Sequence, residues 1–215
     1  MAVHASSAAC MRSGRVQRRA KPLERMWARV FREAGGRVRE RVFLRDMGVP
    51  GVDTDDPRQI EVFVTGLPLE RGLPLAVDAT CVSVLHSNGE PWTLADVVRG
   101  VCLDAAESKK EDTYPELVDS SLVRLKTVAC EVGGRWSTEC CKLVPALAAA
   151  KARAEPAHLQ LAARMAYEAR WWALLSCTQQ DAVAACLIED GVALLDGHDA
   201  DAPLCTEVLL DELRP

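Results

Sequence analysis

The chain has 215 residues, of which 49% are hydrophobic, and its 26 basic and 31 acidic residues give a formal net charge of −5. This composition excludes a polycation and is enough for one domain with a hydrophobic core, with room for an appended helical piece. No apolar run reaches the roughly 18–20 residues of a membrane span, and the N-terminus lacks the long apolar segment of a secretory signal.

The nine cysteines are scattered through the sequence. They form no Cys-x-x-Cys pair and no Cys/His cluster, which argues against a zinc site. Their number is odd and several lie in apolar runs, so we expect reduced core thiols in a nuclear or cytoplasmic protein.

Charge is unevenly distributed along the chain. Arginines and lysines are concentrated between Arg12 and Arg45, whereas the C-terminal end is acidic. Residues 1–22 are predicted to be a disordered basic tail, and residues 191–215 an acidic tail that carries a short final helix at 206–213. The basic segment favours an anionic partner such as nucleic acid, and a simply solvated surface is the alternative.

The first elements are predicted from hydrophobic periodicity. Residues 23–34 carry apolar side chains at helical spacing and are followed by Gly35-Gly36, which predicts a helix and its end. Residues 37–44 begin as alternating charged and apolar residues, which predicts a strand with one solvated face. A loop rich in Gly, Pro and Asp follows over residues 46–57.

A β-hairpin is predicted next, with strands at 60–65 and 75–82. Each strand carries one acid in an apolar run, Glu61 on the first and Asp78 on the second. A turn centred near residues 69–70 would place these acids opposite each other, about 5 Å apart at Cβ. Such a pair needs a proton or a cation between its members. The alternative is that one acid lies on an exposed strand face.

The remaining elements complete an α/β sandwich. Helices are predicted at 93–111, 137–151 and 156–187, and a strand at 122–132. Thr93 is the expected cap of the first of these helices, which ends before Pro115. Its expected buried stripe consists of Val97, Val98, Val101, Cys102, Ala105 and Ala106.

This order of elements, with an acid on each hairpin strand and a lysine further on, resembles the PD-(D/E)XK restriction-enzyme-like nuclease fold. That fold has an α-β-β-β-α-β core, a mixed sheet flanked by helices. The closer resemblance is to the restriction-like endonuclease domain of non-LTR retrotransposon polyproteins. The matching segments are RQIE at 58–61, VDAT at 77–80, ESKK at 107–110, YPEL at 114–117 and VGGRW at 132–136.

The resemblance implies a metal-dependent DNA endonuclease that nicks a target strand during retrotransposition. Glu61, where the family usually has Asp, and Asp78 would hold Mg²⁺ or Mn²⁺. Thr80 stands where a lysine is common in the superfamily, and the resemblance moves that lysine to the following helix. Lys110 fits by its place four residues before Tyr114, whereas helical phase against the apolar stripe favours Lys109. A basic helix end without catalytic role is the alternative for both lysines.

Other residues are candidates with less specific signals. Arg58, Arg135, Arg37 and Arg39 are candidate DNA contacts, although Arg135 lies beside Trp136 and can instead pack or stack there. Two accessory candidates also have structural interpretations: Tyr114 as a core aromatic residue and Glu131 as a solvated strand end. Trp171-Trp172 is expected to pack in the core, with base stacking as the alternative.

The expected organisation is a nuclease core at residues 23–153 and a helical extension at 154–190. No zinc knuckle or polymerase precedes the core, which suggests a relic fragment of a longer polyprotein. DNA is the expected partner, with RNA and a reverse transcriptase domain of the parent polyprotein as further ones, and no membrane. Two alternatives stay open: a catalytically inactive DNA-binding or structural remnant, and a helical protein-interaction module centred on residues 154–190.

Overall fold

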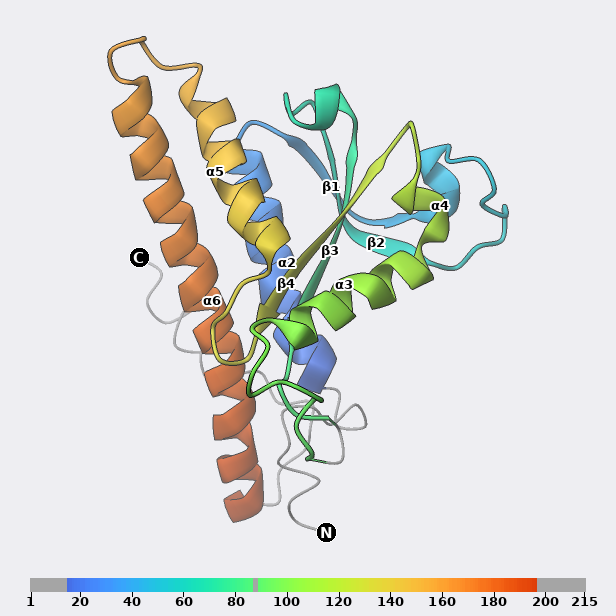
Figure 1. Cartoon of the computed structure of the whole chain (residues 1–215), viewed down its shortest axis with the longest axis vertical. Coiled ribbons are helices and arrows are strands. Elements are labelled where there is room, and N and C mark those ends of the chain that lie inside the picture. The colour runs from blue at the N-terminus through green and yellow to red at the C-terminus, as the bar shows by residue number, and fades with distance from the viewer. Residues whose placement is uncertain (1–14, 87–88, 197–215) are drawn as a thin grey trace.

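The computed structural model describes residues 15–86 and 89–196 (Figure 1). Their order is helix, three strands, helices, strand and two further helices. The main elements are α2 (Arg15–Glu33), β1 (Arg37–Phe43), β2 (Gln59–Thr65), β3 (Leu75–Val82), α3 (Val101–Thr113), α4 (Pro115–Val118), β4 (Arg124–Glu131), α5 (Thr138–Ala152) and α6 (Gln160–Asp196). Short 3-10 turns follow β1 and precede β3, at Leu44–Met47 and Glu70–Gly72.

The four strands form one mixed sheet in the order β1-β2-β3-β4. β2 runs antiparallel to both β1 and β3, and β3 runs parallel to β4. A parallel pair needs a crossover connection, which α3 and α4 supply on one face of the sheet. The predicted mixed α/β class is therefore confirmed.

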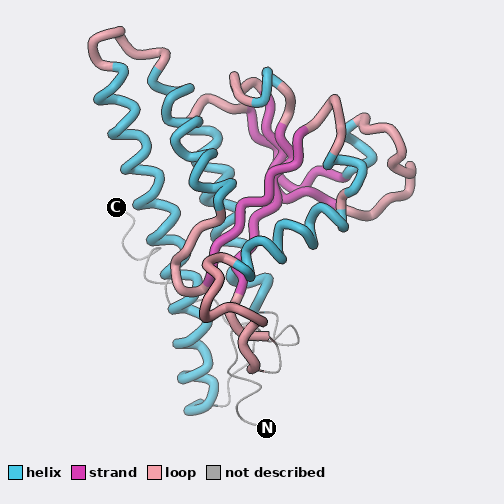
Figure 2. Tube along the Cα trace, viewed as in Figure 1, coloured by secondary structure: helices cyan, strands magenta, loops and turns pink. Residues whose placement is uncertain are grey.

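The sheet lies between two unequal helical layers (Figures 1 and 2). On one face, α2, α5 and α6 pack around a large core that includes Trp27, Phe31, Val77, Leu147 and Trp171. On the other face, α3 and α4 lie over a smaller core built from residues such as Ile60, Phe63, Ala76, Tyr114 and Leu117.

The tight connection between α2 and β1 depends on two glycines. Gly35 has a φ of +100°, a left-handed conformation that favours glycine and ends the helix. A Cβ on Gly36 would lie 2.7 Å from Cγ1 of Val64, so only glycine lets the chain pass this close to β2. The predicted end of this helix is confirmed.

The predicted start of the helix at residue 93 is wrong. α3 begins at Val101, after Gly100 in a left-handed conformation, and Leu94 also has a positive φ of 65°. Val97 and Val98, two members of the expected stripe, are 69% and 43% exposed. The apolar spacing is helical, but the backbone turns twice before the helix starts, so these residues never reach the core.

The predicted domain ends also change. α2 starts at Arg15, so residues 15–22 are helical and do not belong to a disordered tail. α6 continues to Asp196, and the acidic tail beyond it, with the helix predicted at 206–213, lies outside the described residues. Trp171 and Leu175 of α6 are fully buried, which makes this helix part of the core instead of an appendage. None of the described helices has the length and hydropathy to cross a membrane.

Candidate functional site

The two predicted acids lie where β2 and β3 separate. These strands pair at three positions, from Val64↔Leu75 to Val62↔Val77. The same register places Glu61 opposite Asp78 at the next position, beyond the last paired residues. From there β3 continues along β4, whereas β2 stays with β1 and diverges to the other side (Figure 1). The divergence leaves space between the strands at the two acids.

A cavity of about 620 Å³ occupies this space. Residues from α2, β1, β2, β3 and α3 line it, so it is assembled from most of the elements that precede β4. Its charged and polar lining includes Lys21, Glu24, Arg41, Glu61, Thr80 and Lys110.

Asp78 is fully buried and is neutralised by a lysine from the crossover helix. The Nζ atom of Lys110 lies 2.6 Å from Oδ1 and donates a hydrogen bond to Oδ2 at 2.7 Å. Lys109 is exposed, and its backbone carbonyl accepts a hydrogen bond from the Thr113 hydroxyl. Lys110 is therefore the lysine that reaches the acids, in agreement with its place before Tyr114.

Glu61 has an unsatisfied carboxylate oxygen. Its Oε2 atom is buried and has no hydrogen-bond partner. Burial, and then the negative charge of Asp78, raise the pKa of Glu61 to about 8, against the opposing effect of Lys110. A buried carboxylate that has one unpaired oxygen and lies under the influence of a second acid is stabilised by a proton or by a cation.

Glu24 is a third acid at this site, and sequence reasoning missed it. It comes from α2 and lines the same cavity. Burial and the charge of Asp78 raise the pKa of Glu24, while Arg41, Lys21 and Lys110 oppose the rise. Glu24 is the only acid between Arg12 and Arg32, which is the one sequence signal that could have singled it out.

Any divalent cation at these acids would have few protein ligands. Within the described residues, no three His, Cys, Asp or Glu side chains are grouped closely enough to hold a metal by themselves. Mg²⁺ typically binds one or two carboxylates and completes its octahedron with water and substrate phosphate. Glu61, with its orphaned oxygen, and Asp78 are the residues that could supply these carboxylates.

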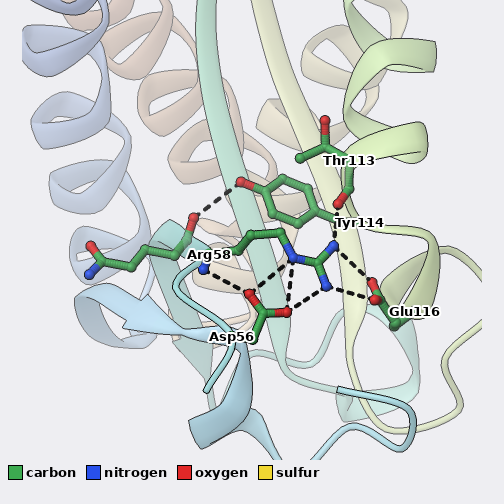
Figure 3. A network of polar contacts seen from close by, with 6 residues as sticks. Asp56, Arg58, Thr113, Tyr114 and Glu116 are labelled. Carbon is green, nitrogen blue, oxygen red and sulfur yellow. Dashed lines mark hydrogen bonds and ion pairs between the residues drawn. The ribbon is translucent and has the colours of Figure 1, made fainter. Parts of the chain in front are cut away.

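Arg58 has a structural role in the molecule (Figure 3). Its guanidinium contacts Asp56 and Glu116, each at 2.6 Å, and donates to the backbone carbonyl of Thr113. These contacts join the loop before β2 to the end of α3, one turn beyond Lys110. Two carboxylates therefore bind the guanidinium of Arg58, and its predicted role as a DNA contact stays a prediction.

Tyr114 continues this connection toward the acids. Its buried hydroxyl donates a hydrogen bond to the backbone carbonyl of Gln59 at 3.1 Å (Figure 3). Burial, followed by the charges of Asp78 and Glu61, raises the pKa of Tyr114. The phenol therefore stays neutral beside the acids and forms part of the wall of the site, so both its core position and its proximity to the site are observed.

Glu131 and Arg135 lie away from the acids. Thr127 of β4 is the register partner of Asp78, and Glu131 is four residues further, about 13 Å along the strand. Glu131 is within 3.4 Å of Arg135 and cannot share a cation with Asp78 at that separation. Arg37 and Arg39 are exposed on β1, where Arg39 lies over the Phe63 ring at 5.0 Å.

Comparison with models of known protein families and with curated proteins finds no match. The geometry of the site is therefore the basis for assigning a function.

Proposed function

We propose that this chain is a metal-dependent DNA endonuclease domain of the restriction-like type, which nicks a target strand in retrotransposition. The observation that carries the proposal is the orphaned oxygen of Glu61, which lines the cavity together with Lys110, the partner of the buried Asp78. The strand order, with β2 antiparallel to both neighbours and a helical crossover before β4, supports the PD-(D/E)XK-like topology.

Each residue of the site has a role in this reaction. Glu61 and Asp78 would hold the cation, which would supply an activated water and offset the charge of the scissile phosphate. The Lys110 ammonium would orient an attacking water or stabilise charge on the phosphate in the transition state. Arg58 and Tyr114 keep the end of α3, and with it Lys110, in position against β2.

Exposed arginines support a nucleic-acid substrate. Arg37, Arg39 and Arg41 follow one another at alternate positions of β1, and Arg41 reaches the cavity that contains the acids. A row of cations leading to an acidic, metal-binding site suits a polyanionic backbone. The resemblance also implies RNA and a reverse transcriptase domain of the parent polyprotein as partners, and the proposal includes both.

A plasmid-nicking assay with Mg²⁺ tests the proposal. Wild type is expected to relax supercoiled plasmid, and EDTA to abolish the reaction. Asp78→Asn keeps the side-chain shape and a polar partner for Lys110 but weakens the cation site, so nicking should fall about 100-fold or more. Asp55→Asn, in an exposed loop, is the matched control and should nick like wild type.

Two results would decide against this function. Nicking by Asp78→Asn at the wild-type rate would show that Asp78 takes no part in the cleavage reaction. If purified wild type gives no nicking with either Mg²⁺ or Mn²⁺, the chain is not an endonuclease. Thermal denaturation of each variant checks that a lost activity does not reflect lost folding.

A catalytically inactive DNA-binding remnant is the second candidate. It is favoured by the contacts of Lys110 with both oxygens of Asp78, which leave that carboxylate already neutralised. This candidate predicts DNA binding by fluorescence anisotropy without nicking under any metal condition. The helical-interaction alternative has less support, because the central part of α6 is buried in the core.

A further inference from the structure

The cavity has a cationic wall in addition to its acids. Arg41 of β1 and Lys21 of α2 both line it, and both side chains are exposed. Neither residue has a hydrogen bond or an ion pair in the part of the chain that the structure describes. Their charges nevertheless reach the site, because both lower the pKa of Glu24.

Arg41 is held in an unfavourable backbone conformation. Its φ of 56° is left-handed, although the residues on either side of it pair regularly with β2, Glu40 with Val62 and Val42 with Ile60. A left-handed conformation is strained for a residue other than glycine and persists where the surrounding structure requires it. At this position Arg41 lies on β1 across from Glu61, the acid with the orphaned oxygen.

Charges of both signs line the cavity. Glu61 and Lys110 come from β2 and α3, Glu24 and Lys21 from α2, and Arg41 from β1. If Arg41 and Lys21 served only to neutralise acids, they would be expected to pair with them, as Lys110 does with Asp78. Two cations that form no hydrogen bond or ion pair with the described residues are instead suited to an external anion such as a phosphate.

We propose that Arg41 and Lys21 form a phosphate-binding subsite for the nucleic-acid backbone beside the scissile phosphate. This inference rests on the endonuclease proposal and extends it by naming the residues that position the substrate. Arg41 presents a planar guanidinium that can bind a phosphate through two hydrogen bonds, and Lys21 adds a point charge.

Binding of a short fluorescein-labelled DNA duplex, followed by anisotropy in EDTA, tests the subsite without cleavage. Arg41→Gln and Lys21→Gln are each expected to weaken binding about fivefold to tenfold. Each should also lower the slope of log affinity against log salt by about one, because one phosphate contact is lost. Arg153→Gln, exposed at the end of α5, is the control and should leave affinity and slope unchanged.

Arg41→Gly separates a role in binding from a role in folding. Glycine adopts a φ of 56° without strain, so the Tm of this variant should equal or exceed that of wild type. DNA binding should still weaken as it does for Arg41→Gln. A lower Tm with unchanged DNA binding would assign Arg41 to the fold and overturn the inference.

The remaining outcomes distinguish the two proposals. If wild type nicks plasmid while both glutamine variants bind DNA with wild-type affinity and salt slope, the subsite is refuted and the endonuclease assignment stands. If wild type neither binds the duplex nor nicks plasmid, both proposals fail together.

Discussion

Two adjacent lysines on α3 have very different surroundings. Lys110 contacts both oxygens of Asp78, whereas Lys109 is exposed and four residues from the end of the helix. We predict that Lys110→Gln lowers the nicking rate about 100- to 1,000-fold, since it removes a preorganised cation beside the reacting phosphate. Lys109→Gln, with the same change one position away, should stay within about twofold in initial-rate assays on supercoiled plasmid. Equal losses of nicking rate for the two variants would mean that the rate depends on the total positive charge of the protein and not on the position of Lys110.

Two sequence signals gave different predictions of which lysine reaches Asp78. The place of Lys110 before Tyr114 predicted the lysine that contacts Asp78, whereas helical phase favoured Lys109. The phase was wrong because its reference stripe omitted Leu103, which is buried in α3 together with Cys102. At about 100° per residue, Lys110 lies about 30° from the midpoint of these two residues and Lys109 about 70°.

At the scale of elements, Glu33 joins α2 to α6. It accepts hydrogen bonds from Trp171 at 2.9 Å and from Arg170 at 3.1 Å. The bond from Arg170 is the main cause that lowers the pKa of Glu33 to about 2, from 4.5 in the unfolded chain. A lowered folded pKa means that the stabilisation is complete above pH 4.5 and is lost as pH falls toward 2.

We therefore predict a pH-dependent cost for Glu33→Gln. At pH 7 the variant should lose about 1 kcal/mol of unfolding free energy, because the charged contacts are partly exposed. Urea unfolding at pH 7, 5 and 3 measures the difference from wild type, which should shrink at the lowest pH. A difference that stays constant over this range would mean that shape, and not charge, holds the two helices together.

Pairing between elements was partly predictable. Turn position and strand length placed Glu61 opposite Asp78, and the observed register agrees with that placement. The proximity of Glu24 to these acids was not predictable, because it depends on how α2 crosses the sheet. Local pattern specifies a helix and its buried face, but its crossing position is set by packing of the whole core.

For the molecule as a whole, α6 completes the main core. Trp171 is fully buried and stacks on Tyr167 at 5.7 Å, and Leu175 is buried one turn further on. Trp171→Ala is predicted to cost about 3–5 kcal/mol of unfolding free energy through the cavity that it leaves. Met165→Ala, which changes a residue 65% exposed on the same helix, should stay within about 0.5 kcal/mol in the same urea titration.

A small effect of Trp171→Ala would restore the view of α6 as a separate extension. The sequence predicted a long helix here, because an Ala- and Leu-rich segment needs only local pattern to be recognised. It did not predict that this helix belongs to the core, because Arg170 and Trp171 contact Glu33 of α2, more than a hundred positions earlier. Such contacts leave no local signal in the sequence.

The position of β1 in the sheet has a consequence for solubility. β1 is an outer strand of the described sheet, and an outer strand offers unpaired amide and carbonyl groups to a second molecule. Arginine side chains at alternate positions and the left-handed turn at Arg41 make this strand a poor template for such pairing. The same positive charges that would attract a nucleic acid therefore also keep copies of the protein from associating strand to strand, so neutralising all three arginines should promote aggregation.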